Sequence, residues 1–314
     1  MTTDVKVYDA EGTAFVLSDP DLSTLRDTLP GHAYEPVVLA LLGPLLRQPG
    51  AVFADIGALY GYLTVWAARH APEATVVAFE PEASYVDVLR RNLALNNLPE
   101  VRVEQVALVD EEGTFDFITK TIMPQVASTG PRGYLRALRR SLLPQPTPNG
   151  PLEPIVAAPS QSRVGLLPFL AATAAHPVRI QLQPRAVDRT HQVPGITFDD
   201  WSARSGIRPT IVKIDVHGGE GMVLGGMAAA LRDHVQHVLL ELHTRDLLVK
   251  YDHRSILRTL LSAGFDLFEV RGFRSSKGWL APVPESAVDR VADQSTWSPI
   301  DLYFMKFFYA RRQT

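Results

Sequence analysis

The sequence predicts an α/β protein built on a mostly parallel sheet. Short apolar runs of strand length alternate with longer amphipathic segments of helix length. This alternation is typical of the right-handed crossovers that place parallel strands side by side. The chain has 314 residues and is 46% hydrophobic, which is enough to bury both faces of a central sheet.

The first half of the sheet is expected from a repeated strand–helix unit. AVFADI is apolar until Asp55, and the GYLTVWAARH that follows has the period of a helix. TVVAFE and ASYVDVLRRNLALNN repeat the unit, and VRVEQVAL adds a strand. The predicted strands are 51–56, 75–80 and 101–108, and the predicted helices are 61–70 and 83–97.

The second half of the sheet resumes after a long gap. TIVKIDV, HVLLELH and FDLFEV are apolar runs, and periodic segments separate them. IDLYFMKFFYA closes the sheet as the last strand, which we expect to run antiparallel. The predicted strands are 210–216, 237–243, 265–270 and 300–310, and the predicted helices are 219–231 and 254–264.

Three regions are expected along the chain. Residues 1–50 form an N-terminal hairpin and cap helix, and residues 51–118 and 195–314 form the core. Residues 119–194 hold half of the chain's 24 prolines, which neither donate to a sheet ladder nor fit inside helices. We interpret this segment as an inserted lid or substrate-binding segment, because long insertions at the end of a core strand often cover a site.

Composition narrows the function classes. The formal charge of −3 and pI near 6.3 provide no general attraction for nucleic acid or for a membrane surface. The absence of cysteine excludes disulfides, thiolate metal sites and thiol nucleophiles. MTTDVKVYDAEG has no signal-peptide pattern, and no run approaches ~18 apolar residues. We expect a cytoplasmic protein with a small-molecule partner, and a homo-oligomer is compatible with this composition.

A candidate cofactor turn follows the first strand. In VFADIGALYG, Asp55 ends the apolar run, and Gly57 and Gly61 permit a tight turn whose N–H groups face a ligand. Glu80 ends the next strand, 23 positions after Gly57, where an acid can accept hydrogen bonds from both hydroxyls of a ribose. The spacing therefore predicts a nucleoside site.

Two nucleoside cofactors compete for this turn. A dinucleotide site requires G-x-G-x-x-G without a negative charge beside the pyrophosphate, whereas this turn reads D-x-G-x-x-x-G. S-adenosylmethionine carries a sulfonium and an ammonium group instead, which Asp55 can stabilise directly or through water. We therefore favour S-adenosyl-L-methionine over NAD.

An ordered set of motifs along the chain resembles a known family. FADIGALYGY, AFEP, NLALNN, VALVDEEGTFDF, ITFDDW, IVKIDVHGGE and VLLELH, in this order, are similar to motifs of the FkbM family of S-adenosylmethionine-dependent methyltransferases. The resemblance covers residues 34–118 and 195–270. It implies a class I methyltransferase fold, a Rossmann-like seven-stranded sheet whose last strand is antiparallel.

The resemblance also implies which residues hold the cofactor. The turn surrounds the methionine part, Glu80 meets the ribose and residues 105–107 lie at the adenine, while HAYEP is similar to a segment that covers the cofactor. The expected set is Tyr34, Glu35, Asp55, Gly57, Ala58, Gly61, Tyr62, Glu80, Pro81, Gln105, Val106, Ala107 and Asp215. Leu59 and His217 depart from the family pattern, which commonly has Asn and an acid there, and residues 119–194 do not resemble the family.

Candidate residues for catalysis lie at the ends of the next two strands. KIDVHGGE supplies Lys213, Asp215, His217 and Glu220, and ELH supplies Glu241 and His243. Lys213, Asp215 and His217 share one face of their strand, as do Glu241 and His243, and the expected catalytic set is Asp215, His217, Glu241 and His243. Asp215 is a candidate to orient the cofactor, the acceptor or a base, and either histidine is a candidate base for a hydroxyl proton. We favour His243, which the matched motif retains. The same four residues offer ligands for a divalent metal ion, but the spacing alone does not favour one.

These observations predict an S-adenosylmethionine-dependent O-methyltransferase. The acceptor is expected to be a hydroxyl of a small molecule, and the resemblance implies a secondary metabolite or a sugar. An N- or carboxyl-methyltransferase of the same fold stays open, since those acceptors need less help from a base. A non-catalytic nucleoside-binding scaffold also stays open, because Leu59 and His217 depart from the pattern.

Overall fold

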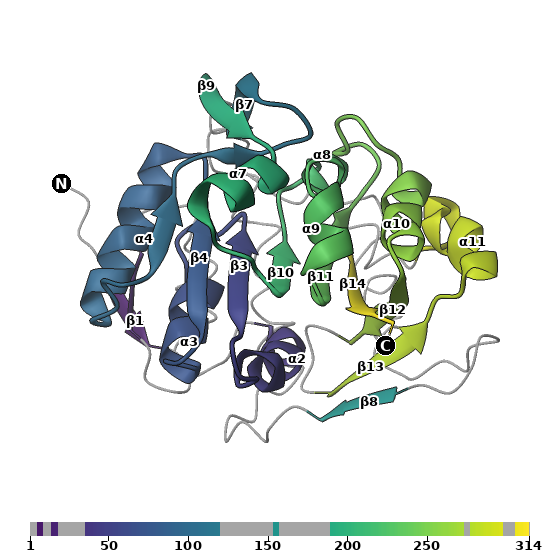
Figure 1. The fold of residues 1–314 in the computed structure, drawn as a ribbon, viewed down its shortest axis with the longest axis horizontal. Coiled ribbons are helices and arrows are strands. Elements are labelled where there is room, and N and C mark those ends of the chain that lie inside the picture. The colour runs from purple at the N-terminus through teal and green to yellow at the C-terminus, as the bar shows by residue number, and fades with distance from the viewer. Residues whose placement is uncertain are drawn as a thin grey trace, which may run out of the picture.

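A nine-stranded sheet forms the centre of the protein (Figure 1). The computed structural model describes residues 5–8, 14–17, 35–119, 153–156, 189–272, 277–297 and 305–313. In spatial order the strands are β5 (Arg102–Glu104), β4 (Thr75–Phe79), β3 (Val52–Ile56), β10 (Ile211–Ile214), β11 (His237–His243), β14 (Met305–Arg312), β12 (Phe265–Arg271), β13 (Lys277–Pro282) and β8 (Glu153–Val156).

The first seven strands of this order confirm the predicted fold class. β5, β4, β3, β10 and β11 are parallel, and β14 runs antiparallel between β11 and β12. The chain moves outward from β3 to β4 and β5, and then returns to β10 on the other side of β3. The strand order therefore reverses between β3 and β10, where open parallel sheets place their ligands.

Two antiparallel strands, β13 and β8, extend the sheet beyond the predicted seven. β8 lies inside the segment 119–194 and contains Pro154, which pairs with Trp279. A proline is tolerated there because β8 is an edge strand. The remaining part of the expected lid lies outside the described residues, apart from Thr119 at the end of β7 and the beginning of β9.

Helices cover both faces of the sheet. One apolar core joins the sheet to α2 (Pro36–Leu46), α3 (Tyr62–His70) and α4 (Ala83–Leu95). The core on the other face joins it to α7 (Phe198–Ser205), α8 (Glu220–Gly225), α9 (Ala228–Asp233), α10 (His253–Ser262) and α11 (Val288–Ala292). The short helices η2 (Glu285–Ala287) and η3 (Gln294–Thr296) flank α11. None of the helices in the described part of the chain combines the length and apolar composition that crossing a bilayer requires.

Two smaller sheets complete the described structure. β1 (Val5–Tyr8) and β2 (Ala14–Leu17) pair antiparallel, where the sequence predicts a hairpin. β9 (Arg189–Ile196) lies between β6 (Ala107–Leu108) and β7 (Gly113–Thr119), and β7 and β9 project together from the main sheet (Figure 1). β9 joins the last residues of the segment 119–194 to the core.

Two predicted elements are divided in the structure. The expected strand 101–108 becomes β5 in the main sheet and β6 in the small one. The expected helix 219–231 becomes α8 and α9, with a break at Gly226. A Cβ atom on Gly226 would lie 2.0 Å from the carbonyl oxygen of Val109, so the break places backbone against backbone.

Candidate functional site

The glycine turn, residues 57–61, lies at the carboxyl end of β3. Gly57 has φ 80° and Gly61 has φ 86°, a left-handed conformation that glycine adopts without steric cost. A Cβ atom on Gly57 would lie 1.8 Å from the carbonyl oxygen of Asp215. The turn is therefore packed directly against the loop that follows β10.

The N–H groups of the glycine turn bond within the protein, whereas the sequence predicts that they face a ligand. The N–H groups of Gly57 and Ala58 both donate to the carbonyl of Phe79. The N–H of Leu59 donates to Glu80 Oε2 at 2.9 Å. These three N–H groups are not available to a ligand, because their hydrogen bonds connect the turn to the end of β4 and to Glu80. A pyrophosphate, which relies on free backbone N–H groups, finds no such donors in them.

Asp55 is buried one residue before the end of β3. Its Oδ2 accepts a 2.6 Å hydrogen bond from Thr64 Oγ1 on α3, and the side chain is 1% exposed. Burial raises the pKa of Asp55, and the charge of Lys213 and the Thr64 hydroxyl partly offset this rise. Lys213 is the neighbour of Asp55 in the register of β3 and β10. Thr64 was not among the predicted site residues.

Glu80 follows β4 and is also buried. Its two carboxylate oxygens accept 2.9 Å hydrogen bonds from the N–H groups of Leu59 and Glu82. Burial raises the pKa of Glu80 to about 7, against the opposing effect of those hydrogen bonds. Each oxygen retains a second lone pair, so the carboxylate keeps acceptor capacity for a ligand.

The other predicted cofactor residues surround these two carboxylates. Ala58 and Tyr62 are buried, and Pro81 is half-buried. The loop between β5 and β6 contains exposed Gln105 and half-buried Val106, and half-buried Ala107 begins β6. Glu35 is buried at the start of α2, with φ 62°, and its charge acts on Lys213 and Glu241. Tyr34 lies outside the described residues.

A buried lysine joins the carboxylates at the ends of β10 and β11. Lys213 Nζ lies 2.9 Å from Asp215 Oδ2 and 3.7 Å from Glu241 Oε1. Burial disfavours the ammonium, but the charges of Asp215 and Glu241 outweigh it and raise the pKa of Lys213. Burial and the charges of Asp215 and Glu35 raise the pKa of Glu241. Lys213 was absent from the predicted catalytic set, although strand alternation places it on the face of Asp215.

Two histidines and a glutamate form a chain of short contacts beside this lysine. His217 Nδ1 lies 2.8 Å from His243 Nε2, and His243 Nδ1 lies 2.6 Å from Glu220 Oε1. Asp215 Oδ1 lies 3.8 Å from His243 Nε2 and 3.9 Å from His217 Nε2. Asp215, His217 and His243 are called the Asp–His–His cluster below.

The members of this cluster differ in access and charge. The His217 side chain is 44% exposed, whereas that of His243 is 2% exposed. Burial lowers the pKa of His217. Burial has the same effect on His243, but the hydrogen bond and charge of Glu220 outweigh it and raise the pKa of His243 to about 9. Lys213 and the two histidines hold the pKa of Asp215 below its usual range despite burial.

The exposed fractions of the side chains distinguish the predicted catalytic residues that can reach a ligand from those that cannot. His217 is the histidine that faces solvent, although the family motif favoured His243. Glu241 is buried, and its ion pair among the described residues is with Lys213, so it acts on the site through Lys213. Glu220, at the start of α8, holds His243 in place. The sequence offers it as a candidate in KIDVHGGE, but it was not in the expected catalytic set.

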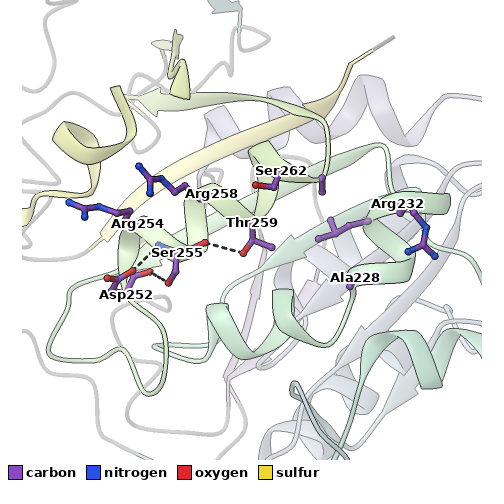
Figure 2. A pocket seen from close by; sticks show the side chains of 10 residues that line it. Ala228, Arg232, Asp252, Arg254, Ser255, Arg258, Thr259 and Ser262 are labelled. Atoms are coloured by element: carbon purple, nitrogen blue, oxygen red, sulfur yellow. Dashed lines mark hydrogen bonds between the residues drawn. The ribbon is translucent and has the colours of Figure 1, made fainter. Parts of the chain in front are cut away.

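A groove of about 800 Å³ lies away from this site, between α9 and α10 (Figure 2). Arg232, Arg254 and Arg258 line it, and none of the predicted site residues does. Arg254 and Arg258 both form ion pairs with Asp289, at 2.9 and 3.2 Å. The groove is therefore a separate surface feature.

Comparison with known proteins covers both parts of the site. The model of a family described as "Methyltransferase FkbM domain" matches residues 55–267. The protein "Methyltransferase 1" of Beauveria bassiana (strain ARSEF 2860) is 23% identical over 188 residues, which are 60% of this chain and 63% of the relative. The chain thus spans less than two thirds of that relative's length.

Solved methyltransferase structures show weaker likeness. The methyltransferase FkbM of Methylobacillus flagellatus KT is 13% identical, with a TM-score of 0.38, over 74% of this chain and 43% of that one. A SAM-dependent methyltransferase of Agrobacterium tumefaciens is 10% identical, with a TM-score of 0.41, over 96% of this chain and 68% of that one. The family model, which includes both the glycine turn and the Asp–His–His cluster, spans most of the chain, and the protein belongs to the FkbM methyltransferase family.

Proposed function

We propose that this protein transfers a methyl group from S-adenosylmethionine to a hydroxyl oxygen of a small molecule. The observation that supports this proposal is the position of the Asp–His–His cluster. The cluster lies at the carboxyl ends of β10 and β11, and the backbone of Asp215 contacts the glycine turn through Gly57. Groups that bind an acceptor hydroxyl therefore lie beside the candidate cofactor turn.

The charges around the turn suit a cationic nucleoside. Asp55, Asp215 and Glu241 lie around a single buried lysine, Lys213, whose pKa all three raise. Burial raises the pKa of Asp55 and Glu241, so a sulfonium or α-ammonium group bound nearby stabilises their ionised forms, whereas the ionised Asp215 would repel a pyrophosphate. The internal bonding of the turn's amides supports the same choice. Asp55 and Glu80 are the residues that we expect to hold this cofactor.

The chemistry requires little beyond alignment and loss of a proton. When bound, S-adenosylmethionine supplies an electrophilic methyl group on a good leaving group. The acceptor oxygen forms a bond to the methyl carbon, the carbon–sulfur bond breaks, and the hydroxyl proton leaves to solvent. The Asp–His–His cluster orients the hydroxyl and stabilises the negative charge that grows on its oxygen.

A hydroxyl acceptor explains the cluster better than an amine or a carboxylate. An amine is nucleophilic once neutral, and a carboxylate carries no proton at neutral pH, so neither requires a cluster that stabilises an oxygen as its proton leaves. The resemblance to FkbM proteins adds secondary metabolites and sugars as the acceptor class. His217, the exposed histidine, is the residue that we expect to contact the hydroxyl.

The test compares matched acceptors. S-adenosylhomocysteine release is measured for the wild type and for His217→Asn with phenols or sugar alcohols and with amines of the same skeletons. Asn tolerates the φ of 52° at this position. We expect kcat/KM for the hydroxyl acceptor to fall about 100-fold in His217→Asn. Turnover of the amines alone, or equal loss on both acceptors, would contradict the hydroxyl assignment.

A matched control tests for general disruption. His234 lies near the other end of β11, at the C-terminus of α9, and does not belong to the site. His234→Asn should leave hydroxyl methylation unchanged. Calorimetry should also show S-adenosylhomocysteine binding to the wild type, with weaker binding to Asp55→Ala and Glu80→Ala. Unchanged affinity in both variants would remove the basis of the cofactor assignment.

A further inference from the structure

We propose that the Asp–His–His cluster binds a divalent transition-metal ion, with an open coordination position for the acceptor oxygen. The role of that open position rests on the proposed function. The inference that a metal binds is based on the positions of the three cluster side chains and of Glu220 and Lys213, which hold two of them. The spacing in the sequence did not favour a metal ion, whereas the positions of the atoms do.

The three side chains converge from two loops. Asp215 and His217 follow β10, and His243 is the last residue of β11. One ligand atom from each side chain lies within 4.8 Å of those of the other two. Metal–ligand distances of about 2.0–2.2 Å at tetrahedral angles separate neighbouring ligand atoms by ~3.4 Å. The observed separations of 2.8 and 3.8 Å lie on either side of this value, so small side-chain movements complete the site.

Two of the ligands are held from behind by charged groups. Glu220 Oε1 lies 2.6 Å from His243 Nδ1 and also accepts the N–H of Gly218 at 3.0 Å. This contact directs the Nδ1–H of His243 toward Glu220, so Nε2, the nitrogen that faces His217, is the atom positioned to bind a metal, as in metal-bound histidines with a carboxylate behind them. Lys213 holds Asp215 Oδ2 in the same manner, at 2.9 Å. Both side chains thus direct their remaining atoms toward one point.

The second carboxylate oxygen of Asp215, Oδ1, is a further observation in favour of a bound metal ion. Asp215 Oδ1 is shielded from solvent and receives no hydrogen bond from any residue that the structure describes. A buried carboxylate oxygen without a partner is unfavourable. A hydrogen bond between the two histidines alone leaves this oxygen unsatisfied, whereas a metal ion satisfies all three ligands at once.

The ligand types select the class of metal. Two imidazoles with one carboxylate suit Zn²⁺, Fe²⁺, Co²⁺ or Mn²⁺, whereas Mg²⁺ and Ca²⁺ prefer sites made of oxygen atoms alone. Three protein ligands leave a position open, as in catalytic metal sites. The 44% exposure of His217 places that position within reach of a ligand from solvent. A hydroxyl bound there would lose its proton to solvent more readily, because the metal ion lowers its pKa.

Cobalt provides a direct test of this site. The 314-residue chain without an affinity tag is dialysed against a chelator and titrated with Co²⁺, and binding is followed by visible absorption and calorimetry. We expect one Co²⁺ per chain, visible bands that indicate nitrogen ligands, and binding at least 100-fold weaker in His217→Asn. His234→Asn serves as the matched control and should bind as the wild type does. His217 is chosen over His243 because its partial exposure keeps the fold intact on substitution.

The outcomes separate this inference from the proposed function. Absence of Co²⁺ binding up to 100 times the protein concentration, or equal binding by His217→Asn, would overturn the metal site. Asp215→Asn gives a second measurement and should weaken Co²⁺ binding as well. If the chelated protein still methylates hydroxyls at the full rate, the metal has no catalytic role but the proposed function stands. If S-adenosylhomocysteine does not bind while Co²⁺ does, the proposed function fails and the metal site stands.

Discussion

Glu220 and His243 form a buried carboxylate–imidazole pair, with Oε1 and Nδ1 2.6 Å apart. Glu220 is 0% exposed and lies on α8, so this pair joins a helix to the end of β11. The pair fixes which nitrogen of His243 faces the site. Glu220 is therefore a positioning residue that acts through His243.

Glu220→Gln should weaken Co²⁺ binding about 10-fold while the protein stays folded. A neutral amide still accepts the Nδ1 proton of His243, but it polarises the ring less, and such changes behind a metal-bound histidine reduce metal affinity by about 10–100-fold. Co²⁺ calorimetry and circular dichroism measure the two effects. A purely structural role would instead lower the melting temperature and leave the affinity of the folded protein unchanged. Glu220→Asp, which keeps the charge, should recover part of the affinity if the imidazole can still be reached.

Gly57→Ala should impair cofactor binding more than its backbone strain alone explains. The new Cβ atom would lie 1.8 Å from the carbonyl oxygen of Asp215, so the glycine turn and the loop after β10 must separate. We expect S-adenosylhomocysteine affinity to fall at least 10-fold, as measured by calorimetry. Unchanged affinity would show that the contact between turn and loop has no bearing on the cofactor.

Gly264→Ala is the matched control for Gly57→Ala. Gly264 has a similar φ of 83°, but a Cβ atom there would meet nothing within 4 Å. The substitution should lower the free energy of unfolding by about 1–2 kcal/mol, the cost of a left-handed conformation for a residue with a side chain. Its cofactor affinity should equal that of the wild type.

The hydrophobic periodicity of the sequence predicts those helices and strands whose bounds are not changed by contacts with distant parts of the chain. The apolar run HVLLELH corresponds to β11, His237–His243, without a change of bounds. The predicted strand 51–56 loses one residue in β3, and the predicted helix 254–264 lies close to α10. In these segments the hydrophobic pattern and the burial in the sheet require the same structure.

Tertiary contacts decide the elements that the sequence does not predict. The break between α8 and α9 exists because Gly226 meets the backbone of Val109, which lies more than 100 residues earlier. β8 forms at a sheet edge in spite of Pro154. Neither contact has a local pattern that indicates it.

The candidate site is predictable by residue type but not by geometry. Asp215, His217 and His243 were identified because they follow strands that end at one edge of the sheet. Which histidine is exposed depends on the loop after β10, where His217 adopts a φ of 52°. The bond from Glu220 to His243 spans 23 residues and depends on where α8 begins. The internal use of the turn's amides likewise follows from the pairing of β3 with β4.

Lys213→Met should lower the free energy of unfolding by about 3–5 kcal/mol, because it leaves buried carboxylates without their cation. Lys213 is 4% exposed and lies 2.9 Å from Asp215 Oδ2 and 3.7 Å from Glu241 Oε1. Urea unfolding measures the change. Adding Glu241→Gln to Lys213→Met should restore at least 1 kcal/mol, since one of the unpaired charges is then removed. Strict additivity of the two substitutions would show that Lys213 does not stabilise Glu241.

The affinity for S-adenosylhomocysteine should rise with pH between 6 and 8, because Glu80 accepts ribose hydroxyls best when ionised. Burial raises the pKa of Glu80 to about 7, so the carboxylate is mostly protonated at pH 6 and mostly ionised at pH 8. A ligand that binds the ionised form is therefore about 10-fold weaker at pH 6 than at pH 8, and its binding releases protons near pH 7. Calorimetry in buffers of different ionisation enthalpy measures both quantities.

Two variants assign this pH dependence to Glu80. The charges of Glu82 and Asp55 also act on Glu80, and burial raises the pKa of Asp55 as well. Glu80→Gln should bind S-adenosylhomocysteine more weakly and with no change between pH 6 and 8. Asp55→Asn should bind it more weakly but keep the slope. If the pH dependence of the affinity remains in Glu80→Gln and disappears in Asp55→Asn, the group that titrates on cofactor binding is Asp55 inside β3 and not Glu80 after β4.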